Sequence, residues 1–264
     1  MDSHPEQAEV GGAREADVSE PARGDFVYVP IVENKWHIRP DNPAIRLSVL
    51  SAGPGWSGGE RMENRAVEHH QRCREREELF RHRGYDTEHE IRCIIEKARP
   101  FSGTILEIGT GKGYFTAALA REGHSVISVD ISEENQELAL LHLKYLGLKN
   151  LATFKIENAE RLSFTNNSFD VIFSVNTLHH LDKPFCVLDE LLRVLSFKGK
   201  MVLSDFSRAG FALVGKIHAD EGRRHELGVI TLQEAAEYIS TKYFTVQTYS
   251  TTYQETLIAY RPII

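Results

Sequence analysis

Three glycines within five positions, Gly109, Gly111 and Gly113, follow an apolar run that contains Glu107. Glycine lets the backbone turn tightly and approach a ligand closely, and a helix that starts after such a turn favours negative charge at its N-terminus. The stretch ILEIGTGKGYFT (105–116) therefore predicts a ligand site between a strand and a helix. Which ligand it binds depends on why a carboxylate stands in that strand.

Two phosphate-binding loops do not fit this stretch. A P-loop would need glycine at 106 and Ser or Thr at 113, where this chain has Leu106 and Gly113. The dinucleotide fingerprint would need its third glycine at Tyr114, and a pyrophosphate crossing the turn would be repelled by Glu107. S-adenosylmethionine carries cationic groups and no phosphate, so a carboxylate at this position can help to bind its methionine end.

Four segments, in order along the chain, resemble the class I S-adenosylmethionine-dependent methyltransferases, and especially the small-molecule group that includes the quinone-biosynthesis enzymes. The segments are LEIGTGKG (106–113), VISVD (126–130), ENAERLSF (157–164) and FDVIFSVNTLHHL (169–181). The resemblance extends over about residues 85–260. A lone glycine triplet is weak evidence, whereas four segments in register favour S-adenosylmethionine as the cofactor.

The resemblance implies the roles of individual residues. Glu107 would lie near the methionine portion of the cofactor, and Asp130 would accept hydrogen bonds from the ribose hydroxyls. Asn158 stands where the family usually has an aspartate that contacts the adenine amino group, and its amide oxygen can accept the same N–H. The full set of expected cofactor-binding residues is Glu107, Gly109, Thr110, Gly111, Gly113, Asp130, Ile131, Asn158, Ala159 and Asn176.

Methyl transfer is an SN2 displacement, so the protein mainly aligns the reactants and excludes water, and a base is needed only if the acceptor must lose a proton. His179 and His180 follow a strand at the edge where doubly wound folds bind ligands, and Asp205 ends a later strand. These three are the candidate catalytic residues. The alternative is that one of the histidines simply packs or caps the next helix.

Apolar strands alternate with amphipathic helices after Pro100, which predicts a Rossmann-like, doubly wound α/β fold. The last two strands, 243–249 and 251–260, are joined by a tight turn and must pair in antiparallel fashion. We therefore expect a mostly parallel seven-stranded sheet that ends in an antiparallel hairpin. Ser132, the pair Thr231 and Glu234, and the pair Thr87 and Glu90 are expected helix caps.

The chain divides into three expected parts. Residues 1–61 mix Gly, Pro, Glu and Ala without an apolar period, which indicates a disordered extension or a translated leader that precedes a start at Met62. Residues 62–100 are expected to be helical, either as a charged, solvated segment or as a cover over the cofactor pocket. Residues 101–264 form the cofactor-binding domain, in which the insert 207–230 is expected to select the acceptor.

Composition narrows the function further. The 264 residues include three cysteines without metal-ligand spacing and carry a net charge of −7 without a basic stripe, which argues against disulfides, a metal site and a nucleic-acid surface. The chain has neither a membrane-spanning apolar run nor an export signal, so we expect a cytoplasmic protein with a small-molecule partner. A noncatalytic S-adenosylmethionine-binding module and an NAD-dependent oxidoreductase remain as alternatives, and the sequence does not indicate the oligomeric state.

Overall fold

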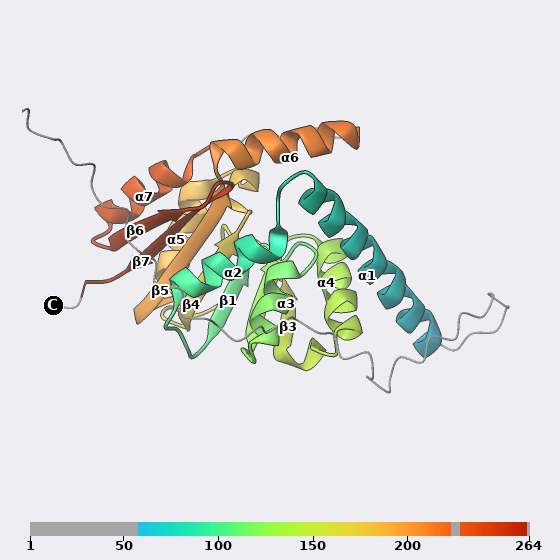
Figure 1. The fold of residues 1–264 in the computed structure, drawn as a ribbon. Coiled ribbons are helices and arrows are strands. Elements are labelled where there is room, and N and C mark those ends of the chain that lie inside the picture. Colours follow the sequence, from blue (N-terminus) through green and yellow to red (C-terminus); the bar gives the residue numbers. More distant parts are fainter. Residues whose placement is uncertain (1–57, 223–227, 263–264) are drawn as a thin grey trace, which may run out of the picture. The chain divides into compact units, whose positions relative to one another are not determined.

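The computed structural model describes residues 58–222 and 228–262, and its centre is a seven-stranded sheet with the strand order β3-β2-β1-β4-β5-β7-β6 (Figure 1). Strands β1 to β5 pair in parallel, whereas β7 is antiparallel to both β5 and β6. The predicted doubly wound sheet with a terminal antiparallel hairpin is confirmed. The strands are β1 Ile105–Ile108, β2 Val126–Asp130, β3 Ala152–Ile156, β4 Phe169–Val175, β5 Leu195–Phe206, β6 Thr245–Ser250 and β7 Gln254–Tyr260.

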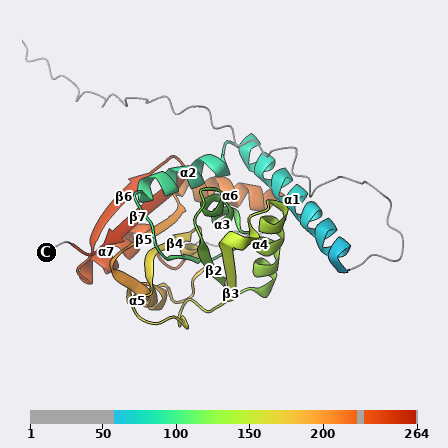
Figure 2. The ribbon, with the colours of Figure 1, turned by 90° about the horizontal axis from the view of Figure 1, so that it is seen from below.

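Helices cover both faces of this sheet. Figures 1 and 2 show α2 and α3 on one face and α5 and α7 on the other. Two short 3-10 turns connect further elements: η1 leads from α4 into the start of β3, and η2 follows the carboxyl end of β4. The helices and turns are α1 Gly58–His82, α2 Thr87–Ala98, α3 Tyr114–Arg121, α4 Glu133–Tyr145, η1 Lys149–Leu151, η2 Leu178–His180, α5 Pro184–Val194, α6 Arg208–Asp220 and α7 Leu232–Thr241.

The alternation of side chains along β1 decides where its carboxylate points. Leu106 and Ile108 are buried in the core shared with α5 and α7, while Ile105 packs in the core shared with α2 and α3. Successive residues of a strand face opposite sides, so Glu107 faces the α3 side together with Ile105. An ionisable group is thereby placed under the first turn after the glycines.

Two of the predicted helix caps are confirmed. Ser132 accepts a hydrogen bond from the Asn135 amide at the start of α4. At the start of α7, Thr231 and Glu234 form a reciprocal capping box. These caps satisfy backbone donors that a helix leaves unpaired at its first turn.

The predicted capping box at Thr87 and Glu90 is wrong. Asp86 is the N-cap of α2 and accepts a hydrogen bond from the His89 amide. Glu90 is buried and instead accepts a hydrogen bond of 2.6 Å from the hydroxyl of Thr251, which precedes β7. A tertiary partner that is distant in sequence has replaced the local one.

The N-terminal helix begins earlier than the sequence suggested. Helix α1 starts at Gly58, so the expected boundary at Met62 falls inside it, while the expectation for residues 1–57 lies outside the described part of the chain. In the insert, α6 buries Val214 and Ile217, whose spacing of three residues places them on one face of the helix. Residues 223–227, which include Arg223 and Arg224, are also outside the described residues.

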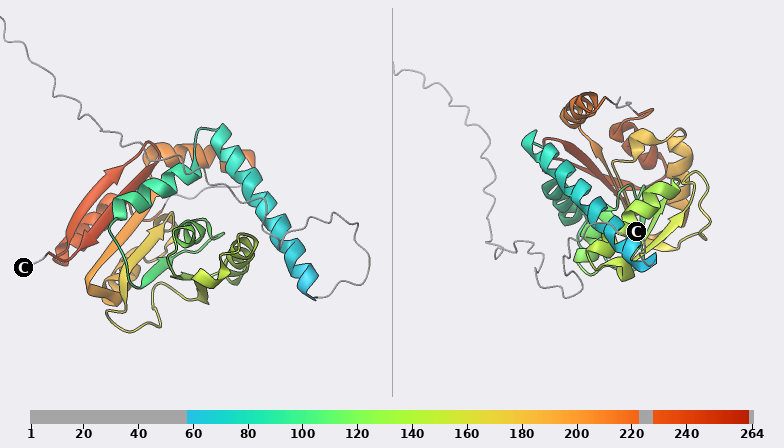
Figure 3. Two further views of the ribbon diagram at one scale, coloured as in Figure 1. Left: turned by 60° about the horizontal axis from the view of Figure 1, so that its bottom comes forward. Right: turned by 90° about the vertical axis from the view of Figure 1, so that its right-hand side faces the viewer.

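Helix α1 contacts two other helices, α4 and α6 (Figure 3). Near its start, Arg65 forms an ion pair of 2.8 Å with Glu137 of α4. Just beyond its end, Arg83 forms an ion pair of 2.7 Å with Asp220 of α6. Exposed ion pairs contribute little energy, so burial of the inner face of α1, including Cys73 at 1% exposure, holds the helix in place.

Buried imidazoles fill the contact between α1 and α4. The ring of His70 stacks on Tyr145 with centroids 3.9 Å apart, and its edge contacts His142 at 5.8 Å. Burial lowers the pKa of His70 and of His142 to about 4, and nearby Arg74 adds to the effect at His70. Both rings are therefore neutral in the folded protein at neutral pH, while the unfolded chain would protonate them near pH 6.5.

Protonation of His70 and His142 should consequently destabilise the folded protein. For each histidine, stability is lost as pH falls from the unfolded pKa near 6.5 toward the folded pKa near 4, because the unfolded state binds more protons in that window. Glu107, whose pKa burial raises to about 7, acts in the opposite direction, so the test is a difference between variants. In urea titrations, the wild type should lose about 1 kcal/mol more stability between pH 7.5 and pH 5.5 than His70→Phe, whereas the control His89→Gln, at an exposed site, should follow the wild type. The same pH dependence in all three proteins would contradict the assignment.

Candidate functional site

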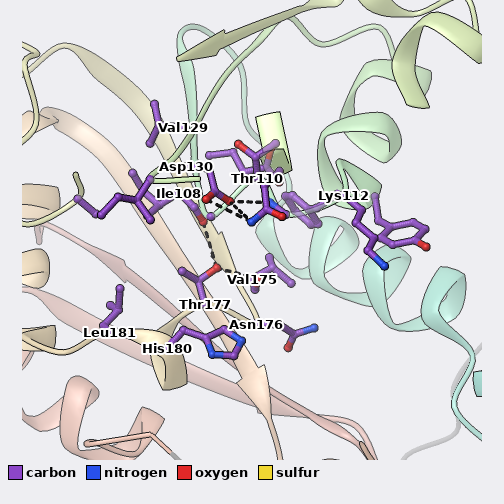
Figure 4. A pocket seen from close by; sticks show the side chains of 18 of the residues that line it. Ile108, Thr110, Lys112, Val129, Asp130, Val175, Asn176, Thr177, His180 and Leu181 are labelled. Carbon is purple, nitrogen blue, oxygen red and sulfur yellow. Dashed lines mark hydrogen bonds between the residues drawn. The ribbon is translucent and has the colours of Figure 1, made fainter. Parts of the chain in front are cut away.

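A cavity of about 630 Å³ lies at the carboxyl ends of β1, β2 and β4 (Figure 4). This is the edge at which doubly wound sheets bind ligands, since the loops after parallel strands meet there. Most of the residues expected to bind a cofactor line it, together with one candidate catalytic residue. They are Glu107, Gly109, Thr110, Gly111, Asp130, Ile131, Asn158, Ala159, Asn176 and His180.

Three of the expected site residues do not line the cavity: Gly113, His179 and Asp205. Gly113 has a φ of +77°, and a Cβ on it would lie 2.9 Å from the Cβ of Ala139 in α4. The third glycine therefore allows the loop to pack closely against α4. His179 and Asp205 are 6% and 4% exposed and lie behind the cavity wall.

Glu107 is a buried carboxylate held by two hydroxyl groups. It is 2% exposed and accepts hydrogen bonds from Thr116 of α3 and, at 2.7 Å, from Ser128 of β2. Ser128 is its register partner in the neighbouring strand. Burial raises the pKa of Glu107 to about 7, and the two hydrogen bonds oppose that shift. A cation bound beside it would favour the ionised form.

The amide groups of the glycine loop are engaged within the protein. The amides of Gly109 and Thr110 donate to the carbonyl of Val129 at 2.8 and 3.2 Å. The amide of Gly111 donates to Asp130 Oδ2 at 2.9 Å, and that of Gly113 to the Thr110 carbonyl at 2.9 Å. A loop that binds a pyrophosphate through its backbone needs these N–H groups for the ligand. The loop therefore does not have the properties of a phosphate site.

Asp130 organises the next part of the cavity. In addition to the Gly111 amide, its carboxylate accepts a hydrogen bond of 2.9 Å from the Ser132 amide and contacts the side-chain amide of Asn135 at 3.3 and 3.4 Å. A carboxylate offers about four lone-pair positions, and these donors approach all four, so a hydroxyl donor would replace the longer contacts from Asn135. Asp130 thus positions the loop and lines the cavity.

Asn158 forms a local turn. Its side-chain oxygen accepts a hydrogen bond of 2.8 Å from the backbone amide of Glu160. The oxygen that was expected to accept the adenine N–H therefore already has one partner, although a second lone pair remains. The side-chain NH2 group of Asn158 adds a donor that the aspartate usual at this position would lack.

The cavity has a strongly acidic lining. Among the described residues that line it, Lys112 is the one lysine or arginine, against six carboxylates. One of the six, Glu160, is paired with Lys183 at 2.9 Å. Such a lining favours a cationic ligand over an anionic one. The carboxylates belong to Glu90, Glu107, Asp130, Glu157, Glu160 and Asp182.

His180 and His179 form a pair of tilted, contacting rings with different environments. His179 donates from Nδ1 to Asp205 Oδ1 at 2.6 Å, and its backbone amide donates to Asp205 Oδ2 at 3.0 Å. The His180 ring lies 3.9 Å from the His179 ring, is exposed, and borders the cavity. Desolvation, followed by the neighbouring His179, lowers the pKa of His180. His180 is therefore neutral near pH 7 and can accept a proton.

Within residues 58–222 and 228–262, no group of three or more His, Cys, Asp or Glu side chains is placed to hold a metal ion. None of the helices in those ranges is both long enough and apolar enough to cross a membrane.

Comparison with known proteins identifies the fold family. A sequence profile for the methyltransferase domain matches residues 106–203. The ubiquinone biosynthesis O-methyltransferase of Psychrobacter arcticus is 31% identical over 116 residues, 42% of this chain and 45% of that protein. The ubiquinone/menaquinone biosynthesis C-methyltransferase of Zymomonas mobilis is 33% identical over 135 residues, 49% of this chain and 53% of that protein. Residues 106–203 thus match the methyltransferase domain family, and the chain shares the fold of S-adenosylmethionine-dependent methyltransferases.

The chain spans about half the length of the curated relatives it matches. Among solved structures, a methyltransferase from Aquifex aeolicus superposes with a TM-score of 0.53 at 20% identity, covering 72% of this chain and 96% of that one. The [4+2]-cyclase SpnF superposes with a TM-score of 0.55 at 14% identity, covering 67% and 82%. These similarities show a shared fold, and a fold does not determine the reaction.

Other residues that line the cavity gave no signal in the sequence. Tyr85 precedes α2 and Gln254 begins β7, yet both line the cavity beside Asn176. The face of α2 supplies Glu90 and Ile94. No motif joins positions so far apart in sequence, because their proximity depends on how β7 inserts between β5 and β6.

Two glycines of the loop, Gly109 and Gly111, differ in what a side chain would meet. At Gly109, where φ is +83°, a Cβ would lie 2.1 Å from Thr177 Oγ1, whereas at Gly111, where φ is +51°, it would meet nothing within 4 Å. We expect Gly109→Ala to lower the free energy of unfolding by about 2–4 kcal/mol, and Gly111→Ala by about 1 kcal/mol. Urea denaturation of both variants measures the difference. Equal losses would mean that the approach of Thr177 does not constrain the loop.

Proposed function

We propose that this protein transfers a methyl group from S-adenosylmethionine to a small-molecule acceptor. The observation that carries the proposal is the combination of a glycine loop with engaged amides and an acidic cavity containing the buried Glu107. S-adenosylmethionine has a sulfonium and an ammonium group and no phosphate, so it fits a site that repels phosphate. The family assignment supports the same cofactor.

The remaining lining residues suit the nucleoside part of this cofactor. Ile131 borders the cavity with 72% of its surface exposed, as expected for an apolar side chain that covers a planar base when the ligand is bound. Asp130 would accept hydrogen bonds from the ribose hydroxyls, and Asn158 with Ala159 would contact the adenine ring. Gly111 leaves open space on its Cβ side, which allows close approach of a ligand.

When bound, S-adenosylmethionine supplies a methyl group on a cationic sulfur that is already a good leaving group. The chain has to hold the acceptor in line, exclude water and, for an acceptor that must ionise, accept a proton. His180 borders the cavity and is the candidate base. His179 and Asp205 do not reach the cavity, so their role would be to position His180.

Two alternative functions are supported to different degrees by the structure of the cavity. An NAD-dependent oxidoreductase is disfavoured because the loop amides that would hold the pyrophosphate are engaged. A noncatalytic cofactor-binding module is compatible with the same cavity, since binding and turnover use different residues. Because the curated relatives are named for quinone biosynthesis, quinone precursors are the first acceptors to test.

A cytoplasmic location and the absence of a nucleic-acid partner belong to the same proposal. The three cysteines, Cys73, Cys93 and Cys186, are free thiols, as is usual in a reducing compartment. The net charge of −7 and the acidic cavity would repel a polyanion.

Calorimetric titration of the full chain tests the cofactor. We expect micromolar binding of S-adenosylmethionine and S-adenosylhomocysteine and no binding of NAD, with Glu107→Gln and Asp130→Asn each weakening the first two at least about tenfold. Affinity should also fall several-fold between pH 7.5 and pH 6, because Glu107 with a pKa of about 7 becomes protonated and loses its charge. The Glu107→Gln variant should not show this decrease. Binding of NAD alone would overturn the proposed cofactor.

The role of His180 is tested by release of S-adenosylhomocysteine in the presence of quinone precursors. For an acceptor that must lose a proton, His180→Gln should lower kcat about 100-fold or more while leaving the affinity for S-adenosylmethionine unchanged. Asp205→Asn should lower kcat less, because it acts only through His179. Wild-type activity in the His180 variant would remove the residue from the mechanism.

A further inference from the structure

Tyr85 is a buried phenol at the wall of the cavity. It is 3% exposed, and its ring is packed between Phe80, Phe206 and Tyr253 with centroid distances of 5.8 to 5.9 Å. Three aromatic neighbours leave the ring little freedom to rotate out of its place. The side chain is therefore held at a fixed place among the residues that line the cavity.

A network of hydrogen bonds sets the direction of the Tyr85 hydroxyl. Gln254 donates from Nε2 to Tyr85 Oη and to Asn176 Oδ1, both at 2.8 Å, while Ser204 donates to Gln254 Oε1 at 3.3 Å. In this arrangement the Gln254 nitrogen faces two oxygens and its oxygen faces a hydroxyl. The Tyr85 oxygen is thus the acceptor, and among the described residues no hydrogen bond uses its proton.

The strand order fixes which end of the proposed cofactor reaches Tyr85. Asp130 ends β2 and Asn158 follows β3, so the nucleoside would lie over that half of the sheet edge. The amino-acid end would then extend over β1 and β4, where the lining includes Glu107 and Asn176. Glu107 suits the ammonium group, but the adjacent carboxylate group needs a hydrogen-bond donor.

Few donors are present in this half of the cavity. The amides of Gly109, Thr110 and Gly111 are engaged, and the α2 face contributes Glu90, which would repel a carboxylate. We propose that the Tyr85 hydroxyl, oriented by Gln254, donates a hydrogen bond to the amino-acid carboxylate of S-adenosylmethionine. This inference rests on the proposed function and adds a residue that selects the intact amino-acid group.

Burial also keeps the Tyr85 hydroxyl protonated, and therefore a hydrogen-bond donor, at neutral pH. It raises the pKa of the phenol to about 12, while hydrogen bonds from Gln254 and Asn176 oppose the shift. The group therefore stays protonated at neutral pH, and it can bind a carboxylate without adding a positive charge beside the cationic sulfur. A hydrogen bond from a neutral donor to an ionised acceptor is stronger than one between neutral groups.

The test compares S-adenosylmethionine with its decarboxylated analogue, which retains the ammonium and sulfonium groups. In calorimetric titrations of the full chain, Tyr85→Phe should lower the affinity for S-adenosylmethionine about tenfold. Its affinity for the decarboxylated analogue should stay within about twofold of the wild-type value. Tyr249→Phe, on β6, is the matched control and should change neither affinity. Gln254→Met should give a smaller loss that is also selective for S-adenosylmethionine, because it frees the Tyr85 hydroxyl to rotate.

Three outcomes would overturn the inference. If Tyr85→Phe lowered the affinity for both ligands equally, the residue would have a structural role only. A carboxylate-selective loss in Lys112→Gln but not in Tyr85→Phe would assign the contact to the lysine. Unchanged affinities in Tyr85→Phe would exclude the hydrogen bond. Failure of wild-type protein to bind S-adenosylmethionine at all would instead refute the proposed function, and the two failures are thereby distinguished.

Discussion

The bond between the Asp130 carboxylate and the Gly111 amide is the constraint on which the rest of the site depends. Together with the two amides that donate to the Val129 carbonyl, it ties the glycine loop to the end of β2. These N–H groups of the loop are thereby bonded within the protein, and carboxylates line the cavity beside them. A turn that resembles a phosphate loop in sequence thus has the opposite electrostatic character, because its donors are satisfied within the protein.

Because these loop amides are engaged, the two sides of the cavity offer different groups to a ligand. Glu107 and Asp130 provide negative charge on one side, where the loop cannot bind anions through its backbone. Donors for an anionic group must then come from elements outside the loop, and Tyr85 lies at the junction of α1 and α2. Since α1 is anchored to α4 through buried rings and to α6 through Arg83 and Asp220, the position of Tyr85 depends on the docking of the whole N-terminal helix. The expected cover over the pocket therefore contributes a lining residue at its end.

The fold followed from the sequence because each strand and helix carries its own signal. Ser132 and Thr231 cap helices through local hydrogen bonds, which depend only on residues three positions away. The prediction failed at Glu90 because a distant partner, Thr251, binds its carboxylate. Likewise β5 begins at Leu195, where a register irregularity opposite β4 joins its first residues to the sheet. Local interactions could be predicted, and tertiary ones could not.

The same distinction applies to the site. The motif residues from Glu107 to Asp130 were predictable because strand, turn and helix are contiguous there, whereas Gln254 enters the cavity only through strand pairing at the far end of the chain. Within a motif, the sequence did not show which of two adjacent histidines would border the cavity. On the 3-10 turn η2, the ring of His179 points toward Asp205, whereas His180 lies beside the cavity. Because a cyclase shares this fold, the reaction must be decided by such orientations. In this protein, the neutral imidazole beside the cavity and the carboxylate behind it are arranged as a base and its support would be.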